Sequence, residues 1–231
     1  MSIESLDVRY RPARGNTVKT PRPTSLTSSY GCTYDAWNRL VKVYVDVNTN
    51  GDYDTGTDTL ITLNEYDGLN RRAKKHIDTA APGNPNGVDT YRHFYYNSGW
   101  QMIETRKTTT ESTAPDTLQP EYQHVWSQRY VDAAVCRDKN TDTDDLCDDG
   151  RIYYLNDANM NVTTLVDTGG DALERYVYDP YGAVTIYDDD WSDTRGSSSY
   201  DNPILYCGYY RDAETGLYCV RNRFYHAQLG R

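Results

Sequence analysis

The sequence predicts an all-β protein built of successive antiparallel hairpins, and three observations support this prediction. Aromatic or branched residues alternate with polar ones along short stretches such as 40–45 and 175–178, which is the period of a strand with one wet face. A turn motif that begins with Tyr-Asp or a close variant separates these stretches. The 231 residues include 23 Tyr and 4 Trp. Tyr suits such a sheet because its ring can be buried while its hydroxyl reaches water.

Residues 1–30 show no clear periodicity, apart from a candidate short strand at 8–10. Pro12, Pro21 and Pro23 punctuate this segment, and each removes a backbone donor that a hairpin would need. We therefore expect an extended N-terminal arm over 1–30. Such an arm lies on its own sheet or crosses to a neighbouring copy and pairs there as a strand.

From residue 31 to about 175 the chain repeats a turn, and we expect divergent hairpins throughout this region. Tyr66-Asp67 follows Tyr34-Asp35 at a distance of 32 positions (66 − 34). An Asp or Asn opens the turn and an Asn or Gly stands three residues later at 35/38, 67/70, 156/159 and 179/182. The first side chain can form an Asx-turn and the second tolerates a positive φ, so the spacing is a backbone requirement and indicates no catalysis.

The last quarter of the chain, 176–231, carries the strongest hairpin patterns. Asp179-Pro180-Tyr181-Gly182 has the residues of a type I turn, and residues 212–216 separate two aromatic stretches. The segment YDPYG, followed by NPILYCGYYRDAETGLYCVRNRFYHAQLGR, resembles the C-terminal core of the Rhs/YD-repeat proteins. The resemblance implies that the hairpins form a curved, shell-like or spiral sheet in a secreted or surface-exposed protein.

Family members differ in what this sheet does. The resemblance implies a shell around a variable C-terminal toxin in bacterial members, and a support for cell–cell adhesion in animal relatives. Toxin-bearing members often cleave themselves beyond the core, using aspartates in a DPxG-type segment that follows a Gly-Arg pair. This sequence ends at Leu229-Gly230-Arg231. The four His are scattered and no HExxH, GxSxG or P-loop pattern occurs, so we expect no enzymatic activity.

Two acidic stretches are candidate calcium loops. Oxygen-bearing side chains recur at every second position, as in the first part of an EF-hand loop, and Gly51 stands sixth in the first stretch. Thr57 stands where the bidentate Glu of such a loop would be. The candidate ligands of a structural Ca²⁺ are Asp46, Asn48, Asn50, Asp52 and Asp54 in the first stretch, and Asp138, Asn140, Asp142 and Asp144 in the second. The alternative is a pair of solvated acidic hairpin tips.

Five cysteines permit two disulfides that would each hold a hairpin together. Cys207 and Cys219 flank the 212–216 turn, and Cys136 and Cys147 flank an acidic loop in the same way. Cys32 would then have no disulfide partner. Bridges at these positions would indicate an oxidising, extracellular setting. Buried free thiols that act as small hydrophobes are the alternative.

Charge and hydropathy limit the binding partners and the cellular compartments that are compatible with this sequence. A net charge of −10 argues against nucleic acid, because phosphate neutralisation requires a surplus of Lys and Arg. No apolar run is long enough for a membrane span. The segment Met1-Ser2-Ile3-Glu4 lacks the features of a signal peptide. From the family resemblance and the cysteines we still expect an extracellular or cell-surface protein, and Asn161-Val162-Thr163 is a formal glycosylation sequon.

Three functions are compatible with these features. The first is an extracellular structural protein that assembles through its N-terminal arm and open sheet edges into a homopolymeric filament or surface layer. The second is a truncated delivery shell without its payload. The third is a surface module for adhesion or glycan binding, in which exposed Tyr and Trp stack on sugars. The arm and the small number of hairpins, about seven, favour the first.

Overall fold

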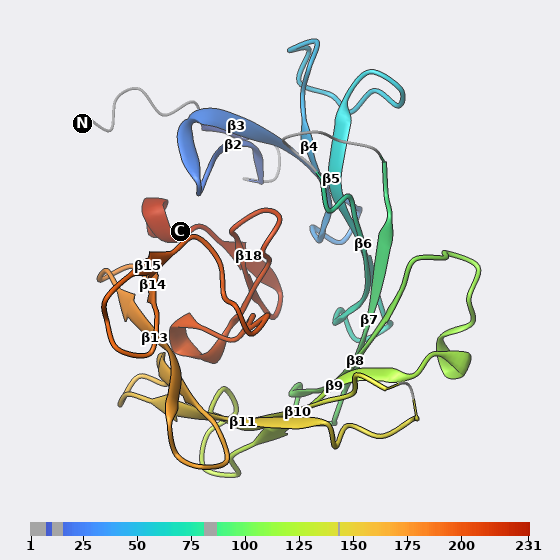
Figure 1. The fold of residues 1–231 in the computed structure, drawn as a ribbon. Helices are drawn as coiled ribbons and strands as arrows, with labels where there is room; N and C mark the ends of the chain where they lie inside the picture. Colours follow the sequence, from blue (N-terminus) through green and yellow to red (C-terminus); the bar gives the residue numbers. More distant parts are fainter. Residues whose placement is uncertain (1–7, 11–15, 81–86, 143) are drawn as a thin grey trace.

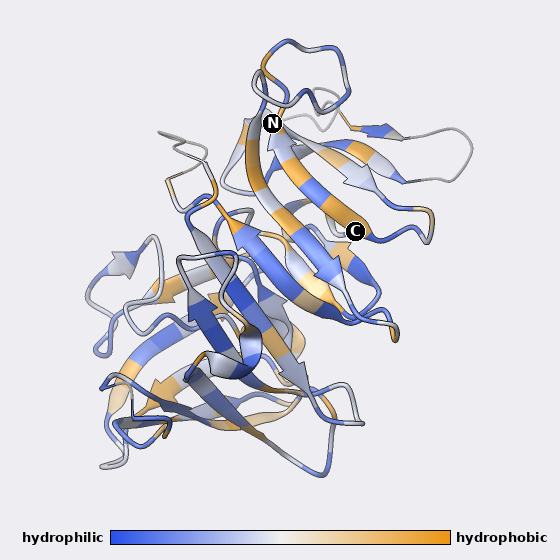
Figure 2. Cartoon of the chain, turned by 90° about the vertical axis from the view of Figure 1, so that its right-hand side faces the viewer, coloured by the Kyte–Doolittle hydropathy of each residue, from blue (hydrophilic) through white to orange (hydrophobic). Residues whose placement is uncertain are grey.

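The computed structural model describes residues 8–10, 16–80, 87–142 and 144–231. Fifteen strands form one antiparallel sheet in which each strand pairs with its neighbours in the sequence, and this confirms the all-β prediction. We call this sheet the wall. It curves around the C-terminal segment, as Figure 1 shows. Hydrophobic segments alternate with hydrophilic ones along many wall strands (Figure 2).

The wall strands run in chain order. They are β1 (Arg9–Tyr10), β2 (Thr17–Arg22), β3 (Ser25–Tyr34), β4 (Leu40–Val45), β5 (Thr59–Tyr66), β6 (Arg72–Ile77), β7 (Thr90–Tyr96), β8 (Met102–Thr108), β9 (Pro120–Trp126), β10 (Ala134–Lys139), β11 (Gly150–Asn156), β12 (Val162–Val166), β13 (Ala172–Tyr178), β14 (Val184–Tyr187) and β15 (Thr194–Arg195). A single-turn 3₁₀ helix, η2 (Pro115–Thr117), lies in the loop before β9.

The prolines near the N-terminus do not prevent a local hairpin, and our expectation on this point is wrong. β2 and β3 pair antiparallel, with Pro21 opposite Ser29. The register shifts between Pro21 and Arg22, so an irregularity absorbs the residue that cannot donate to the ladder. Residues 16–30 therefore belong to the wall rather than to a free arm. Residues 1–7 and 11–15, including Pro12, lie outside the described part of the chain.

Six connections between wall strands use the Tyr-Asp turn, and we call them the YD turns. They join β3–β4, β5–β6, β7–β8, β9–β10, β11–β12 and β13–β14. Because they are every second connection of an antiparallel sheet, they lie along the same edge. In the first turn, Asp35 Oδ1 accepts hydrogen bonds from the backbone N–H groups of Trp37 and Arg39 at 2.9 and 3.0 Å. Asp179 does the same for Tyr181 and Ala183.

The predicted positive φ three residues after the opening Asp is present in three of the four turns. The φ angles of Asn38, Asn70 and Gly182 are 64°, 64° and 88°. The predicted pair 156/159 is wrong by one position. That turn opens at Asp157, whose Oδ1 accepts the N–H of Asn159, and Met160 has the positive φ of 62°.

The residue that precedes each opening Asp explains why the motif contains Tyr. The hydroxyl of Tyr66 donates a hydrogen bond to the carbonyl of Leu40 at 2.7 Å. Leu40 is the first residue of β4 and directly follows the preceding YD turn. Four other residues at this position make the equivalent bond: Tyr96 to Arg72, Trp126 to Met102, Asn156 to Ala134 and Tyr178 to Val162. Where Trp or Asn replaces Tyr, a side-chain donor is kept. The motif thus connects neighbouring hairpins as well as closing one.

Both halves of the motif should contribute measurably to stability. Replacing Asp179 with Ala removes two capping hydrogen bonds, and we expect the free energy of unfolding to fall by about 1–2 kcal/mol. Tyr178→Phe removes one hydrogen bond and should cost about 1 kcal/mol. Urea denaturation measures both changes. Tyr181→Phe is the matched control, since this side chain is exposed and the change should stay within about 0.5 kcal/mol. Equal costs for all three variants would contradict the proposed roles.

After β15 the chain turns inward. Residues 200–231, which we call the plug, lie inside the curve of the wall (Figure 1). The plug contains a three-stranded sheet of β16 (Tyr210–Arg211), β17 (Tyr218–Val220) and β18 (Arg223–Tyr225), with 3₁₀ turns η3 (Tyr206–Gly208) and η4 (Ala227–Leu229). The wall thus extends to Arg195.

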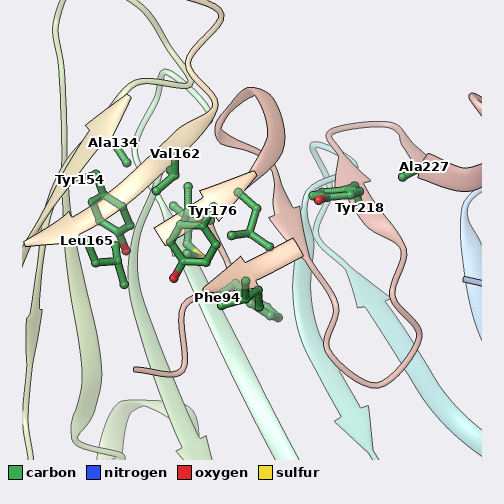
Figure 3. Close-up of a cluster of buried hydrophobic side chains, with 12 residues drawn as sticks. Phe94, Ala134, Tyr154, Val162, Leu165, Tyr176, Tyr218 and Ala227 are labelled. Atoms are coloured by element: carbon green, nitrogen blue, oxygen red, sulfur yellow. The ribbon is translucent and has the colours of Figure 1, made fainter. Parts of the chain in front are cut away.

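The hydrophobic core lies between the wall and the plug. The main cluster combines wall residues Phe94, Met102, Ala134, Tyr154, Val162, Leu165, Tyr176 and Ile186 with plug residues Ile204, Leu205, Tyr218 and Ala227 (Figure 3). A second cluster comprises Tyr30, Cys32, Leu40, Val43 and Ile61, and Phe224 of the plug packs against it. Without the plug, the buried face of the wall would have no partner.

Candidate functional site

The contact between the wall and the plug contains a buried group of four charged side chains. Asp212 follows β16, and its carboxylate meets two cations of β6: Arg72 Nη1 at 2.6 Å and Lys75 Nζ at 2.7 Å. Lys75 also pairs with Glu214 at 2.9 Å. The side chains of Asp212, Arg72 and Lys75 are each at most 2% exposed. Such a group links the two parts of the protein across a sequence separation of 140 residues.

The charges in this group stabilise one another. Burial by itself disfavours the charged form of Asp212, but Arg72 and Lys75 hold its pKa below the usual value of 3.8. Burial likewise opposes the charge of Lys75, and Asp212 and Glu214 raise its pKa above 10.5. Asp212, Arg72 and Lys75 are therefore ionised at neutral pH. Removing one partner would leave the others buried and uncompensated.

Two further polar contacts hold the start of the plug. Glu174, fully buried in β13, accepts hydrogen bonds from Ser198 Oγ at 2.5 Å and from the Ser199 N–H at 2.9 Å. Arg137 of β10 donates to the backbone carbonyls of Tyr200 and Asp201 at 2.5 and 2.8 Å. The connection from β15 into the plug is therefore held by side chains of β13 and β10.

The plug also contacts both ends of the wall. Near the N-terminal end, Tyr30 donates its hydroxyl to the carbonyl of Glu214 at 3.2 Å, and His226 Nε2 lies 2.9 Å from the carbonyl of Pro21. Near the other end, the hydroxyl of Tyr218 donates to the carbonyl of Gly182 at 2.9 Å. Through these contacts the plug connects β2 and β3 to the turn before β14. The sequence analysis did not predict the residues that join the wall to the plug. Strand alternation does not reveal which polar or charged side chains face inward.

The first candidate calcium loop is held by its own hydrogen bonds. Asp46 Oδ2 accepts the N–H of Gly51, and the side-chain amides of Asn48 and Asn50 both donate to Asp54 Oδ2, at 2.7 and 2.6 Å. Asn50 Oδ1 accepts the N–H of Asp52 at 2.8 Å. Of the five predicted residues, the structure joins the side chains of Asn48, Asn50 and Asp54, while Asp46 caps Gly51 and Asp52 contributes its backbone N–H. Asp58, which we did not predict, also caps this loop by accepting the N–H groups of Val47 and Asp54.

The second candidate loop is less well arranged for a cation. Asp138 makes a two-pronged contact with Arg151, at 2.6 and 2.8 Å, so its carboxylate is already paired. Asp142 and Asp144 are exposed, and Asp144 Oδ1 accepts the N–H of Leu146. Asn140 directly follows β10, and Thr143 lies outside the described residues. Over the described part of the chain, no group of three or more His, Cys, Asp or Glu side chains is placed to hold a metal.

Calcium binding at the first loop stays a prediction. Adding CaCl₂ should produce a binding heat in calorimetry and raise the melting temperature, since a ligand specific for the folded state stabilises it. The double variant Asp52→Asn, Asp54→Asn should abolish both effects because it removes two carboxylates. The matched control, Asp116→Asn with Asp189→Asn, removes two exposed carboxylates outside both candidate loops and should leave them unchanged. No heat, together with a melting temperature unaffected by EDTA, would contradict a calcium site.

Both predicted disulfides are absent, and all five cysteines are free thiols. Tyr210, rather than Cys207, stands opposite Cys219 in the plug hairpin. Cys207 lies in η3, where its φ is 52°. Cys136 stands opposite Tyr153 and Val125 in the wall. The cysteines therefore give no support for an oxidising compartment.

The sequon asparagine has a structural role. Asn161 is 8% exposed, its side-chain oxygen accepts the N–H of Cys207 at 2.8 Å, and its amide nitrogen donates to Asp157. A glycan on this nitrogen would break the hydrogen bond to Asp157, and the side chain is buried, so the folded protein does not present Asn161 for glycosylation. In the described residues, no helix has the length and apolar character required to cross a membrane.

Comparison with known proteins supports the fold and the wall-and-plug arrangement. No protein-family model matches the chain. A tRNA3(Ser)-specific nuclease WapA of Bacillus spizizenii is 33% identical over 81 residues, which is 35% of this chain and 3% of the nuclease. The TcdB2–TccC3 crystal structure matches 99% of the chain with a TM-score of 0.63 and 20% identity. The Tc holotoxin pore of Photorhabdus luminescens matches 85% with a TM-score of 0.58 and 20% identity.

These likenesses are consistent with an Rhs/YD-repeat shell fold. The chain spans about a tenth of the structural neighbours, 10% and 8% respectively, and 3% of the nuclease. It therefore resembles one section of much longer proteins.

Proposed function

We propose that this chain is an end-closing section of a YD-repeat shell that encloses a toxin payload. The observation that supports this most directly is the plug, which fills the lumen of the curved wall and is anchored there by the buried group of Arg72, Lys75, Asp212 and Glu214. The role is structural rather than catalytic in this proposal. Asp212 serves as the counter-ion of two buried cations.

Two considerations favour closure over the filament that the sequence suggested to us. The neighbours with known structure are Tc toxin components, and the matched curated protein is a tRNA-specific nuclease by name. In addition, residues 16–30, which the filament hypothesis needs as a free arm, are used within the wall as part of the β2–β3 hairpin. A setting outside the cell or at its surface remains part of the proposal, as does the absence of nucleic-acid partners.

The assembly state of the purified protein distinguishes an end-closing section of a shell from a filament subunit. An end-closing section should be a monomer of 26.5 kDa by light scattering at all concentrations tested, because its buried face is already covered by its own plug. Hydrogen exchange should show that the amides of β16 and β17 are protected as strongly as those of β6. Regular filaments in electron microscopy, or plug amides that exchange as in an unfolded chain, would contradict the proposal.

Enclosure of a payload requires a separate test. The matching section of a TcdB2–TccC3 shell can be replaced by this chain, and the protection of the C-terminal region of the chimera from added protease can be measured. We expect the chimera to protect this region, whereas the same chimera with Asp212→Asn should lose protection. A chimera that forms intact particles but leaves the region open to protease would contradict an enclosing function.

A further inference from the structure

A groove of about 420 Å³ lies at the edge of the wall that carries the YD turns. Its wall side includes Trp37 and Asn38 of the first YD turn and Asn70 of the second. Its plug side includes Asn222, in the connection between β17 and β18, and Arg223, the first residue of β18. The volume falls within the usual range of ligand sites, about 300–1,000 Å³.

The groove carries positive charge, although the net charge of the chain is −10. Its charged lining residues are Arg39, Arg221 and Arg223, and in the described part of the chain no carboxylate lines it. Four other pockets each include at least one Asp or Glu. Arg39 is paired with Asp35, and Arg221 with Asp132. Arg223 is exposed and has no carboxylate partner among the described residues, so a ligand carboxylate can reach it and pair with it.

Side-chain amides add neutral hydrogen-bond donors to the groove. Asn38, Asn70 and Asn222 are all exposed there. The side-chain oxygens of Asn38 and Asn70 accept hydrogen bonds from Asn16 and Arg39, at 3.2 Å each. Among the described residues, the amide nitrogens of Asn38, Asn70 and Asn222 have no acceptor. These nitrogens can therefore donate to hydroxyl or carboxylate oxygens of a ligand.

Trp37 supplies an aromatic surface beside these donors. Its side chain is 73% exposed, and Arg39 lies over one face of its ring at 5.1 Å. Leu69 and Tyr181 hold the same turn position and are exposed as well, so exposure alone does not distinguish Trp37. The cation and the amides in the same groove distinguish it. The C–H groups of a sugar ring pack favourably on an indole, because the face of an aromatic ring carries partial negative charge.

An extended peptide fits the groove less well than a sugar, because the backbone of the first YD turn is already satisfied. Asp35 Oδ1 accepts the N–H groups of Trp37 and Arg39, and the Asp35 carbonyl accepts the N–H of Asn38. A peptide at this position would lack the main-chain hydrogen bonds that give affinity when an extended strand binds to a sheet. The groove offers a ligand its side chains instead: a guanidinium, amides and an indole.

We propose that this groove binds an acidic sugar, that is, a pyranose unit with a carboxylate in an oligosaccharide. The carboxylate pairs with Arg223, the hydroxyl groups accept hydrogen bonds from the asparagine amides, and the sugar ring packs on Trp37. The inference concerns the groove alone and does not depend on the proposed shell function.

Calorimetric titration of the full chain with trigalacturonate, in buffer that contains EDTA, tests the proposal. The trimethyl ester of this sugar is a neutral ligand of similar shape. We expect saturable binding of trigalacturonate and at least about tenfold weaker binding of the ester, because the ester cannot form the charge-assisted contact with Arg223. Equal affinity for the two ligands overturns the proposal. So does the absence of binding at about 10 mM trigalacturonate, a concentration that would nearly saturate even a millimolar site.

An acetylated and amidated Gly-Glu-Glu-Glu-Gly peptide, which carries the same three negative charges, tests whether the groove recognises a sugar. We expect this peptide to bind at least about tenfold more weakly than trigalacturonate, because it cannot pack a pyranose ring on Trp37. Equal binding of the peptide and trigalacturonate shows recognition of charge alone and overturns the assignment to a sugar.

Variants of exposed residues assign the contacts without disturbing the fold. Arg223→Gln should reduce the affinity for trigalacturonate to that for the ester, and it should leave the affinity for the ester unchanged. Trp37→Ala should weaken both ligands at least about fivefold. Arg129→Gln, which changes the net charge equally at an exposed residue of another YD turn, should leave both affinities unchanged. Unchanged affinity in either groove variant, or an equal loss in Arg129→Gln, overturns the proposal.

Discussion

Replacing Asp212 with Asn should lower the free energy of unfolding by about 3–5 kcal/mol, the usual cost of removing one partner from a buried ion pair. Asn keeps the shape of the side chain, but it leaves Arg72 and Lys75 with only Glu214 as a counter-ion. Because these cations lie in the wall and Asp212 lies in the plug, we expect the plug to detach before the wall unfolds. Urea denaturation and limited proteolysis of residues 200–231 would measure the two effects.

The control and a second variant make this prediction specific. Asp189→Asn removes an exposed carboxylate and should change stability by less than about 0.5 kcal/mol. Adding Arg72→Met to Asp212→Asn removes the cation whose salt bridge is lost, while Lys75 keeps its contact with Glu214, so the double variant should recover part of the loss. If the two substitutions simply add, the buried charges are not coupled and the proposed anchor is wrong.

Stability should also fall in mild acid, with His124 as the main contributor. Burial, with smaller effects of Arg137 and Arg92, lowers the pKa of His124 from 6.5 to about 3. The unfolded chain therefore binds a proton at His124 as the pH falls below 6.5, while the folded protein does not. The stabilisation is complete above pH 6.5 and is lost progressively between pH 6.5 and 3. Between pH 6.5 and 5 the loss is about 2 kcal/mol.

The variant His124→Phe isolates this contribution. It cannot take up the proton, so the difference in unfolding free energy between wild type and variant should change across pH 6.5–5 by about 2 kcal/mol. Asp212 acts in a different range. Its pKa is lowered from 3.8, so its stabilisation is present above about pH 4 and is lost only below that value. Parallel pH profiles for wild type and His124→Phe between pH 6.5 and 5 would contradict the assignment.

The strands and turns of the wall can be predicted from the sequence. Its strands follow from period-two alternation, and its turns follow from an Asp that caps its own backbone and an Asn or Gly that accepts a positive φ. These are local requirements, satisfied within four residues, and so they can be recognised without knowing the fold. The Tyr of the motif needed the structure, because its hydroxyl bonds to the previous hairpin, as Tyr66 does to Leu40 across 26 positions.

The way the plug is held, and the failure of the predicted cysteine pairs to form, depend on contacts between distant parts of the chain. Asp212 contacts Arg72 and Lys75 at separations of 140 and 137 residues, and no local pattern encodes which wall strand faces it. The disulfide prediction failed because symmetric spacing about a turn was taken for strand pairing. The plug hairpin begins at Tyr210, and η3 with its left-handed Cys207 precedes it, so the strand register places Tyr210 opposite Cys219.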